Sequence, residues 1–179
     1  MGYTLWVIIG WVRLQRDHRP GAIGGLAPVS TISEQKGGSV LTSGLGKDEM
    51  ARLEEFLGPS RIAVVATIGR NGVPHVTPNW YRFADGRLTM STRKETVKSR
   101  NLSRDGRITV CICSEPLAES YATIWGRAEI SDGESIWPET RAIVERYVTP
   151  ERVDERMSLL QSQNRVIVSV VPEGVIFGA

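Results

Sequence analysis

The residues best suited to chemistry in this sequence form one basic stretch, "STRKETVKSRNLSRDGR", at residues 91–107. It holds six Lys and Arg residues against two Asp and Glu residues, an excess of four positive charges, whereas the whole chain carries a net charge of only +2. Arg can bind a phosphate through two parallel hydrogen bonds, and Lys acts as a movable point charge. The stretch therefore indicates an anion site, and this combination of side chains suits a single phosphate group.

The start of the stretch has the form of a helix N-terminus. Thr92 and Glu95 have the spacing of a capping box, which predicts a helix of about ten residues that ends at Ser103. Free N–H groups and the helix dipole at such a start favour negative charge. The residues expected to bind the phosphate there are Ser91, Thr92, Arg93 and Lys98. Three further cations are expected to be surface or ion-pair residues: Arg100, Arg104 and Arg107.

Two alternative roles of the basic stretch stay open. A short helix with a solvated basic face would show the same charges. Nucleic-acid binding is disfavoured, because no aromatic residue interleaves with the charges to stack on bases. The net charge of +2 is also small for a polyanion binder. We therefore expect no nucleic-acid partner.

Other constellations that could catalyse a reaction or bind a metal are weak. Cys111 and Cys113 lie in the predicted strand "RITVCIC", where residues two apart share a face. No further metal ligand lies near them in the sequence, so we interpret them as packed apolar side chains and expect no metal site. His18 and His75 are the only histidines, and the sequence shows no Ser-His-Asp arrangement.

Length and composition limit the architecture. The chain has 179 residues, of which 41% are hydrophobic and 23% charged, as expected for one globular domain with an appendage. The run "YTLWVIIGWV" is shorter than the roughly 18 apolar residues of a membrane-spanning helix, and no basic residue precedes it as in a signal peptide. We therefore expect a cytoplasmic protein without a membrane partner.

Residues 1–45 differ from the rest of the chain. Gly, Ser and Pro punctuate them without a sustained period, which predicts a poorly ordered N-terminal extension. One hypothesis is that the start codon has been assigned too far upstream; mass spectrometry of the native protein would contradict it by detecting an intact Met1. The folded domain is expected to span residues 46–179.

From residue 46 onward, short β-rich runs alternate with tight turns. The predicted strands are "RIAVVATIG", "VPHVTPNWYRF", "RLTMST", "RITVCIC", "YATIWGRAEIS" and "RVIVSVV", with "GVIFG" as a short seventh. The predicted turns are Asn71-Gly72, Asp85-Gly86 and Asp132-Gly133. The first is expected to be a two-residue hairpin turn in which both residues have positive φ. Pro74 and Pro78 remove backbone donors from the second run, so this strand is expected to be irregular or to lie at a sheet edge.

Helices flank these strands. "KDEMARLEEFLG" predicts a helix that ends at Gly58-Pro59. Its apolar face comprises Met50, Leu53, Phe56 and Leu57. Two more helices are predicted in "WPETRAIVERYV" and "PERVDERMSLLQS". Because helices do not follow every strand, as a parallel fold requires, the pattern predicts a mainly β protein: an antiparallel barrel of six or seven strands with flanking helices.

The order of these signals resembles a known family. "RIAVVATIGRNGVPHVTPNWYRFADGRLTMSTRKETVKSRNLSRDGRITV" is similar to the pyridoxamine 5'-phosphate oxidase-like superfamily of FMN-binding split β-barrels, and within it to the branch that binds the deazaflavin coenzyme F420. The matching motifs are the "ATI…NG.PHV" opening, the "ST…VK.RNL.RD.R" block and the "GRAEI" strand, in this order. The resemblance covers residues 46–179.

The resemblance implies a homodimer with cofactor clefts at the subunit interface. It implies that the third strand and the helix after it hold the cofactor phosphate, at Ser91, Thr92, Arg93 and Lys98. The residues implied to line the isoalloxazine-like ring are His75, Thr77, Asn79 and Trp80. Tyr121 and Trp125 would reach the cofactor across the interface. From the residues alone, His75 also fits an exposed strand position, and Trp80 and Trp125 also fit core or dimer-interface anchors.

The same resemblance implies an F420-dependent oxidoreductase, which transfers a hydride between the deazaflavin and a small electron-poor organic substrate. Two alternatives stay open: an FMN-binding flavoprotein of the same fold, because FMN also presents a terminal phosphate, and a flavin- or deazaflavin-binding protein without turnover. The chain ends in "EGVIFGA", whereas pyridoxamine-phosphate oxidases proper usually carry an Arg-Leu-x-Pro-type ending. Vitamin B6 oxidation is therefore not expected.

Overall fold

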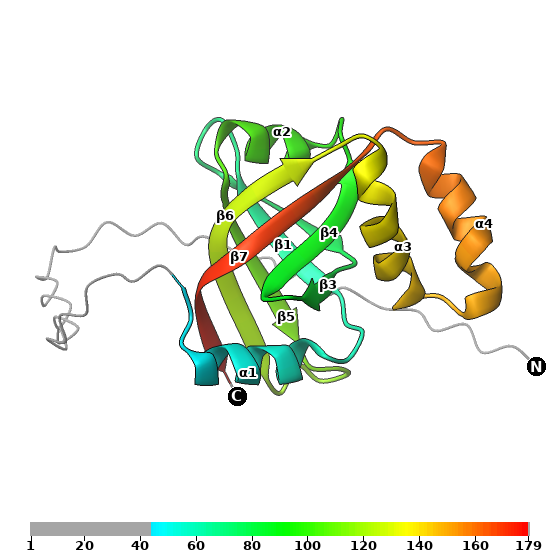
Figure 1. Ribbon diagram of the computed structural model, residues 1–179. Helices are drawn as coiled ribbons and strands as arrows, with labels where there is room; N and C mark the ends of the chain where they lie inside the picture. Colours follow the sequence, from blue (N-terminus) through cyan, green and yellow to red (C-terminus); the bar gives the residue numbers. More distant parts are fainter. Residues whose placement is uncertain (1–43, 179) are drawn as a thin grey trace, which may run out of the picture. The chain divides into compact units, whose positions relative to one another are not determined.

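The computed structural model describes residues 44–178, and within this range the chain forms seven strands and four α-helices (Figure 1). The strands are β1 (Ala63–Ile68), β2 (Pro74–Asn79), β3 (Arg82–Ala84), β4 (Arg87–Arg93), β5 (Arg107–Cys113), β6 (Tyr121–Ser131) and β7 (Arg165–Gly178). The α-helices are α1 (Lys47–Leu57), α2 (Val97–Arg104), α3 (Trp137–Glu145) and α4 (Pro150–Gln161), with a short 3₁₀-helix, η1 (Glu134–Ile136), before α3. The expected N-terminal extension, residues 1–45, lies outside the described residues except for its last two positions.

The seven described strands form one antiparallel sheet in the order β2-β1-β5-β6-β7-β4-β3. The sheet curls into a half-barrel, so that its edge strand β2 approaches β4. Asn79 Nδ2 on β2 donates a hydrogen bond across this open edge to the Ser91 carbonyl on β4, at 3.3 Å. The predicted mainly β fold with flanking helices is confirmed, and Pro74 and Pro78 lie on an edge strand as predicted.

Alternate strand residues fill the interior of the half-barrel. Val65, Leu88 and Val110 are fully buried, while their sequence neighbours face outward. α1 and α2 lie at opposite ends of the barrel (Figure 1), and α1 buries Leu53 and Leu57, as its predicted apolar face requires. Burying each such side chain contributes about 1.5–3 kcal/mol, so the barrel is a stable frame for the polar residues at its edge.

α3 packs beside the barrel next to β4, and α4 packs on the outer side of α3 (Figure 1). Pro138 and Pro150 lie in their first turns, where a helix tolerates proline. The two helices share a small core made of Val144, Val153, Met157 and Leu160. Among the helices of residues 44–178, none has the length and apolar character needed to cross a membrane.

The start of α2 differs from the prediction. The helix begins at Val97, and the Thr96 hydroxyl oxygen caps it by accepting a hydrogen bond of 3.2 Å from the Ser99 N–H. Thr92 lies instead in β4, whose pairing with β7 continues past it. Glu95 accepts a hydrogen bond of 2.8 Å from the side-chain amide of Asn164, the residue immediately before β7. The predicted capping box is therefore wrong, because strand pairing moves the first helical turn along the chain.

Two strand boundaries also differ. The predicted second run divides into β2 and β3 at Trp80 and Tyr81, which raises the count of strands by one. The runs "RVIVSVV" and "GVIFG" form a single strand, β7, rather than two. This long strand pairs with β6 along its length, with a register shift between Trp125 and Gly126. The bulge lets one strand follow the curl of the sheet where the sequence predicted a break.

The first predicted turn takes another form. In the loop between β1 and β2 only Gly72 has a positive φ, of 79°. The Asn71 side chain instead accepts a hydrogen bond of 3.2 Å from the Val73 N–H, so the loop is longer than a two-residue turn. Asp85 and Gly86 both have positive φ, of 54° and 69°, as their hairpin requires.

Candidate functional site

A buried lysine lies where the open edge of the barrel meets α2. Lys98 is only 4% exposed, and its Nζ donates a hydrogen bond of 2.5 Å to Asn79 Oδ1. Asn79 Nδ2 in turn donates to two carbonyl oxygens, of Trp80 at 2.8 Å and of Ser91 at 3.3 Å. Asn79 therefore holds the two edges of the barrel together and also fixes the direction of the Lys98 ammonium group.

The local sequence explains why this lysine points inward. Thr96 caps α2, which places Lys98 in the first helical turn. Lys98, Asn101 and Leu102 recur at helical spacing and are all buried, so one face of α2 packs on the end of the barrel. A four-carbon stem can cross this packed layer and leave the ammonium group at the barrel edge.

An arginine from the last strand completes the site. Arg165 Nε donates to the Ser91 hydroxyl at 2.9 Å, and its Nη1 donates to Gln163 Oε1 at 2.7 Å. The pairing of Arg93 with Arg165 across β4 and β7 brings this residue beside the basic stretch, although it lies far along the sequence. Sequence reasoning missed Arg165, because nothing but the register of the two strands distinguishes it from the other arginines.

The positive charges around Ser91 are not neutralised by the protein. Burial and the nearby charge of Arg165 lower the pKa of Lys98 to about 8. Burial, together with the charges of Arg156 and Arg93, lowers the pKa of Arg165 to about 10. We call Arg93, Lys98, Arg156 and Arg165 the cation cluster. Within residues 44–178 none of its members forms an ion pair with a carboxylate, so the cluster favours an anionic ligand.

The three polar residues of β2 form a stripe that leads to Lys98. His75, Thr77 and Asn79 alternate with exposed residues and are all half-buried, so they share the inward side of the strand. His75 Nδ1 and Thr77 Oγ1 are buried atoms without a hydrogen-bond partner in the described part of the chain. A buried polar atom left unpaired costs about 1–3 kcal/mol, so these two atoms favour a bound group that supplies the missing bonds.

The remaining predicted phosphate residues occupy different positions. Ser91 and Arg93 share one face of β4 with the paired Arg165, and Arg93 is exposed. Thr92 is 6% exposed and lies on the opposite, inward face, where its hydroxyl is 3.5 Å from that of Thr96. Thr92 therefore lies behind the cation cluster rather than on the face that Ser91 presents.

Trp80 is turned toward the helices. Its ring stacks on that of Tyr147, with centroids 4.9 Å apart and an angle of 1° between the planes. The Arg156 guanidinium lies 5.1 Å from the Trp80 ring centroid. This packing matches the role of Trp80 as an anchor between β2 and the pair α3 and α4.

Tyr121 and Trp125 lie elsewhere in the protomer. Both are on the outward face of β6, exposed by 39% and 38%. Their rings lie directly over Gly178 and Gly174 of β7, where a Cβ would come within 2.2 Å and 2.1 Å of a ring atom. A single chain therefore does not bring these two rings to the cation cluster, and their predicted contact with a cofactor depends on a second subunit.

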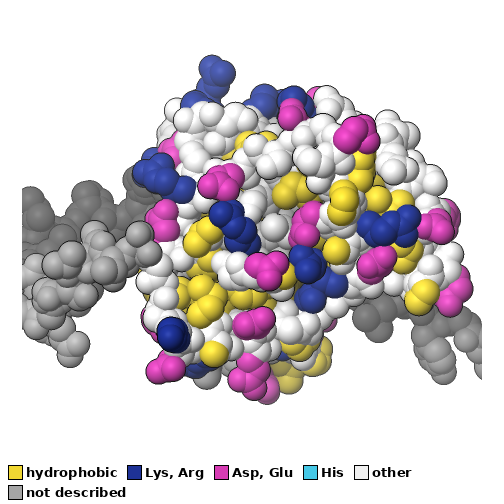
Figure 2. Space-filling model, in the orientation of Figure 1, with side chains coloured by type: hydrophobic (Ala, Val, Ile, Leu, Met, Phe, Trp, Pro, Cys, Tyr) yellow, Lys and Arg dark blue, Asp and Glu magenta, His cyan; other side chains and the backbone are white. Residues whose placement is uncertain are grey.

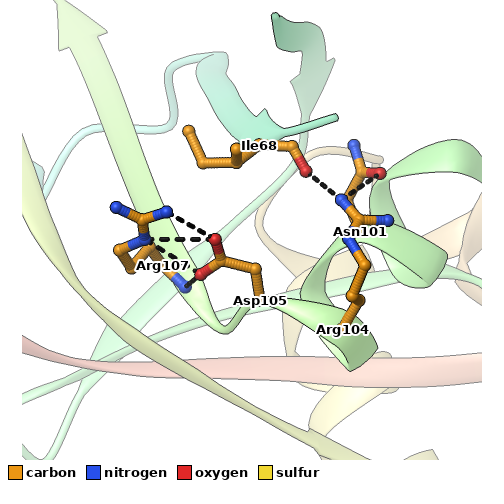
Figure 3. A network of polar contacts seen from close by, with 5 residues as sticks. All are labelled: Ile68, Asn101, Arg104, Asp105 and Arg107. Atoms are coloured by element: carbon orange, nitrogen blue, oxygen red, sulfur yellow. Dashed lines mark hydrogen bonds and ion pairs between the residues drawn. The ribbon is translucent and has the colours of Figure 1, made fainter. Parts of the chain in front are cut away.

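The C-terminal half of the basic stretch is engaged by the protein itself (Figure 3). Arg104 donates hydrogen bonds to the Ile68 carbonyl and, at 3.2 Å, to Asn101 Oδ1. Arg107 forms an ion pair of 2.7 Å with Asp105. These contacts join the end of α2 to the ends of β1 and β5. The prediction that Arg104 and Arg107 are surface or ion-pair residues is confirmed.

The other polar groups show no second cluster of this kind on the face of Figure 2. Lys and Arg side chains there are interspersed with Asp and Glu, without a continuous basic band. Cys111 and Cys113 share the outward face of β5, with their sulfur atoms 3.9 Å apart. Within residues 44–178 no group of three or more His, Cys, Asp or Glu side chains is placed to hold a metal ion.

A curled antiparallel sheet with flanking helices, and with uncompensated cations at its open edge, has the architecture of a split β-barrel. The chain belongs to the pyridoxamine 5'-phosphate oxidase family, a flavin-binding family whose model matches residues 50–177. A search of curated proteins returned no match.

Solved structures share this fold. The conserved hypothetical protein Rv2991 of Mycobacterium tuberculosis is 27% identical, with a TM-score of 0.60 over 76% of this chain and 86% of that one. An F420 reductase is 19% identical, with a TM-score of 0.56 over 69% of this chain and 94% of the other. General stress protein 26 of Bacillus anthracis is 16% identical, with a TM-score of 0.53 over 72% and 92% of the two chains. The last two likenesses concern the fold alone.

Proposed function

We propose that this protein is an F420-dependent oxidoreductase, which transfers a hydride between the deazaflavin and a small electron-poor organic substrate. The observation that carries the proposal is the buried Lys98, which meets the neutral Asn79 and no carboxylate among the described residues. The family supports a flavin-like cofactor. The motifs that resemble the F420-binding branch support the deazaflavin as its particular form, and an F420 reductase has the same fold.

Three members of the cation cluster, Arg93, Lys98 and Arg165, would hold the cofactor phosphate. Lys98 and Arg165 supply charge from two directions, and the Ser91 hydroxyl lies between the barrel edge and Arg165. Arg93, exposed on the same face, can close over the phosphate with two parallel hydrogen bonds. Asn79 acts as a positioning residue, because it directs Lys98 and holds the carbonyl of Ser91.

The stripe on β2 would orient the cofactor ring. His75 Nδ1 and Thr77 Oγ1 are the unpaired buried atoms nearest in sequence to Asn79, and ring oxygen and nitrogen atoms could supply the missing bonds. When bound, the deazaflavin supplies the hydride chemistry. The residues of this chain bind the phosphate, set the height of the ring along β2 and exclude water from its inner face.

A second copy of the chain would complete the cleft. Several large apolar side chains on the outward face of the sheet are strongly exposed: Val64, Val76, Tyr121, Trp125 and Ile176. Such an apolar face is unusual for a monomer. Pairing of this face with that of another copy would bury these side chains and bring Tyr121 and Trp125 of the partner toward the cofactor. A homodimer with two cofactor clefts is therefore part of the proposal.

One alternative has a specific observation in its favour. Several uncompensated cations around one hydroxyl also suit the doubly charged terminal phosphate of FMN, and the family binds flavins. A cofactor-binding protein without turnover would use the same residues. The three functions differ in cofactor preference and in turnover, which can be measured separately.

A titration of the purified full-length protein tests the proposal. F420 and FMN are added in parallel while the quenching of tryptophan fluorescence is followed. F420 is expected to bind more tightly, and its reduced form is expected to be oxidised in the presence of a quinone, an enone or a nitroaromatic compound. Preference for FMN would replace the proposal by the flavoprotein alternative. Tight F420 binding without oxidation by any of these acceptors would favour the protein without turnover.

A further inference from the structure

A second concave site lies beside the cation cluster but shares only one residue with it. The groove between Trp80 and α4 has a volume of about 340 Å³ and is lined by Trp80, Val148, Arg152, Glu155, Arg156 and Leu159. This is within the size range of small-molecule pockets. Its walls are apolar at Val148 and Leu159, and Leu159 is 50% exposed although it is a large hydrophobic side chain. We call this feature the α4 groove.

Arg156 is held in a fixed position within the groove. Its guanidinium lies 5.1 Å from the ring centroid of Trp80, which stacks in parallel on Tyr147. The Tyr147 hydroxyl donates a hydrogen bond of 2.7 Å to the Arg61 carbonyl and accepts one of 3.1 Å from the Tyr81 N–H. The stack is thereby anchored to the barrel, and a guanidinium packed on an aromatic ring loses little freedom when it binds an anion.

Arg156 also differs from Arg152, the other arginine of the groove, because it has no acidic partner among residues 44–178. One turn earlier on α4, Arg152 forms an ion pair with Glu155, at 3.6 Å. Arg156 Nε is buried and has no hydrogen-bond acceptor among residues 44–178, and Arg156 forms no ion pair in that range. The charge of Arg156 also contributes, after burial, to the lowered pKa of Arg165. An uncompensated and preorganised guanidinium therefore faces a groove with apolar walls at Val148 and Leu159, and the one carboxylate in its lining, Glu155, is paired with Arg152.

We propose that the α4 groove is a binding site for a small hydrophobic carboxylate, whose carboxylate group pairs with Arg156 and whose apolar body packs on Val148 and Leu159. The fork of guanidinium donors matches the two oxygens of a carboxylate, and the apolar walls exclude the water that would weaken the pair. This ligand is distinct from the cofactor phosphate, which the cation cluster binds at Lys98 and Arg165. The site goes beyond the proposed function, and it exists whichever flavin-type cofactor binds.

The test uses a matched pair of probes on the full-length protein. Binding of 2-naphthoate and of the uncharged 2-naphthamide is measured by isothermal titration calorimetry. The naphthoate is expected to bind at least about tenfold more tightly than the amide, because one hydrogen-bonded charge pair is worth roughly that factor. Equal affinities for the two probes would overturn the proposal.

Two arginine substitutions, one inside the α4 groove and one outside it, test which charge binds the carboxylate. Arg156→Gln is expected to weaken naphthoate binding about tenfold while leaving naphthamide binding unchanged. Arg141→Gln, the control outside the groove, is expected to change naphthoate binding by less than about threefold, because Arg141 is an exposed charge that already pairs with Asp154 at 2.8 Å. Equal losses for both substitutions would mean general surface attraction and would overturn the site.

A third variant tests the groove wall, and a competition experiment tests whether the groove is independent of the cofactor site. Leu159→Glu introduces a carboxylate at the groove wall and is expected to abolish naphthoate binding. Because Leu159 is half-exposed, this variant is expected to stay folded. It therefore tests the site even if Arg156→Gln does not fold. Unchanged naphthoate binding in Leu159→Glu would contradict the proposal.

In the competition experiment, saturation with FMN or F420 is expected to leave naphthoate binding unchanged. Complete displacement of naphthoate by either cofactor would show that the groove belongs to the cofactor site and would overturn its independence.

Discussion

The two halves of the basic stretch have similar compositions, but only the first half contains a buried cation. In that half Lys94 pairs with Asp132 at 2.7 Å, whereas Lys98 is buried against the neutral Asn79 and Arg93 is exposed without a carboxylate partner in the described chain. In the C-terminal half, Arg104 and Arg107 are bound by a carbonyl, an amide and Asp105 (Figure 3). The density of charge along the sequence therefore does not locate a binding site; charges that the fold leaves uncompensated do.

The burial of Lys98 in the first half of the stretch has a cost in free energy. A buried ammonium group loses its hydration, and a neutral amide returns only part of the lost free energy. The lowered pKa of Lys98, about 8, reflects this cost. The C-terminal half carries no such cost, because its cations remain partly in water or pair within the protein. Five predictions can break or sharpen the comparison.

The largest effect is expected from Lys98→Met, which removes the charge and keeps the stem. A hydrogen bond to a charged group contributes roughly 1.5–3 kcal/mol, and about 1.4 kcal/mol corresponds to a factor of ten. The dissociation constant of the cofactor is therefore expected to rise about ten- to a hundredfold. The melting temperature is expected to stay equal or to rise, since a buried unpaired charge disappears. Fluorescence titration and thermal unfolding measure the two quantities. A large fall in melting temperature with intact affinity would assign Lys98 to the fold instead.

Arg165→Gln is expected to have the next largest effect. Gln retains a donor for the Ser91 hydroxyl but lacks the charge, so cofactor affinity is expected to fall about tenfold. Gln163→Ala is the matched control, because Gln163 only accepts a hydrogen bond of 2.7 Å from Arg165 and presents no charge of its own. It is expected to change affinity by less than about threefold. Equal losses in the two variants would mean that the position of Arg165, rather than its charge, matters.

A smaller effect is expected from pH. Because the pKa of Lys98 is lowered to about 8, its charge disappears as the pH rises through this value. The phosphate of FMN has its second pKa near 6 and keeps its charge over the same range. FMN affinity is therefore expected to fall about tenfold between pH 7 and pH 9, and Lys98→Met is expected to show a flat profile. An equal fall in the variant would attribute the dependence to another group.

The same shift has a consequence for stability, with a sign that can be checked. Lys98 loses its proton near pH 8 when folded but near 10.5 when unfolded, so the unfolded chain binds more protons between these values. The free energy of unfolding of the ligand-free protein is therefore expected to rise with pH across this window through Lys98. Below pH 8 the full cost of the buried charge is present. Urea unfolding at pH 7.5 and pH 9.5, with Lys98→Met as the reference, measures the difference that this residue makes.

Local patterns were sufficient to predict most of the fold. The alternation in "RITVCIC" and the prolines of β2 depend only on neighbours along the chain, and the structure confirms both. The start of α2 could not be predicted in this way, because Thr92 and Thr96 are both plausible caps. The choice between them depends on how far β4 pairs with β7, which is a contact across the sheet.

The candidate site was predictable only in part for the same reason. Lys98 and Asn79 were expected on different grounds, and the structure places them in direct contact. Arg165 comes from the last strand, and strand register brings it to Ser91. Arg156 comes from the last helix, and helix packing brings it near Arg165. Tyr121 and Trp125 face outward from β6, so a single chain cannot show whether they reach a cofactor. Residues that act through tertiary or quaternary contacts leave no local signal in one sequence.

The smallest effect on binding is expected from Arg104→Ala, and it should be accompanied by a loss of stability. Arg104 donates to the Ile68 carbonyl and to Asn101, so its removal leaves two acceptors at the end of α2 without that partner. The loss of these bonds is expected to cost about 1 kcal/mol, which corresponds to a fall in melting temperature of about 3 °C for a domain of this size. Cofactor affinity is expected to change by less than about threefold, because the charge acts weakly at this distance in salt. Arg107→Ala is the control: its ion pair with Asp105 is exposed, so neither cofactor affinity nor melting temperature is expected to change appreciably.

Titrations of Arg104→Ala and Lys98→Met at two salt concentrations compare the two halves of the basic stretch directly. If a polyanion were the true ligand, both substitutions would weaken binding equally and each would reduce the salt dependence. The expected result is that only Lys98→Met weakens binding and only Arg104→Ala lowers the melting temperature. In that case the first half of the basic stretch binds the ligand and the second half stabilises the fold.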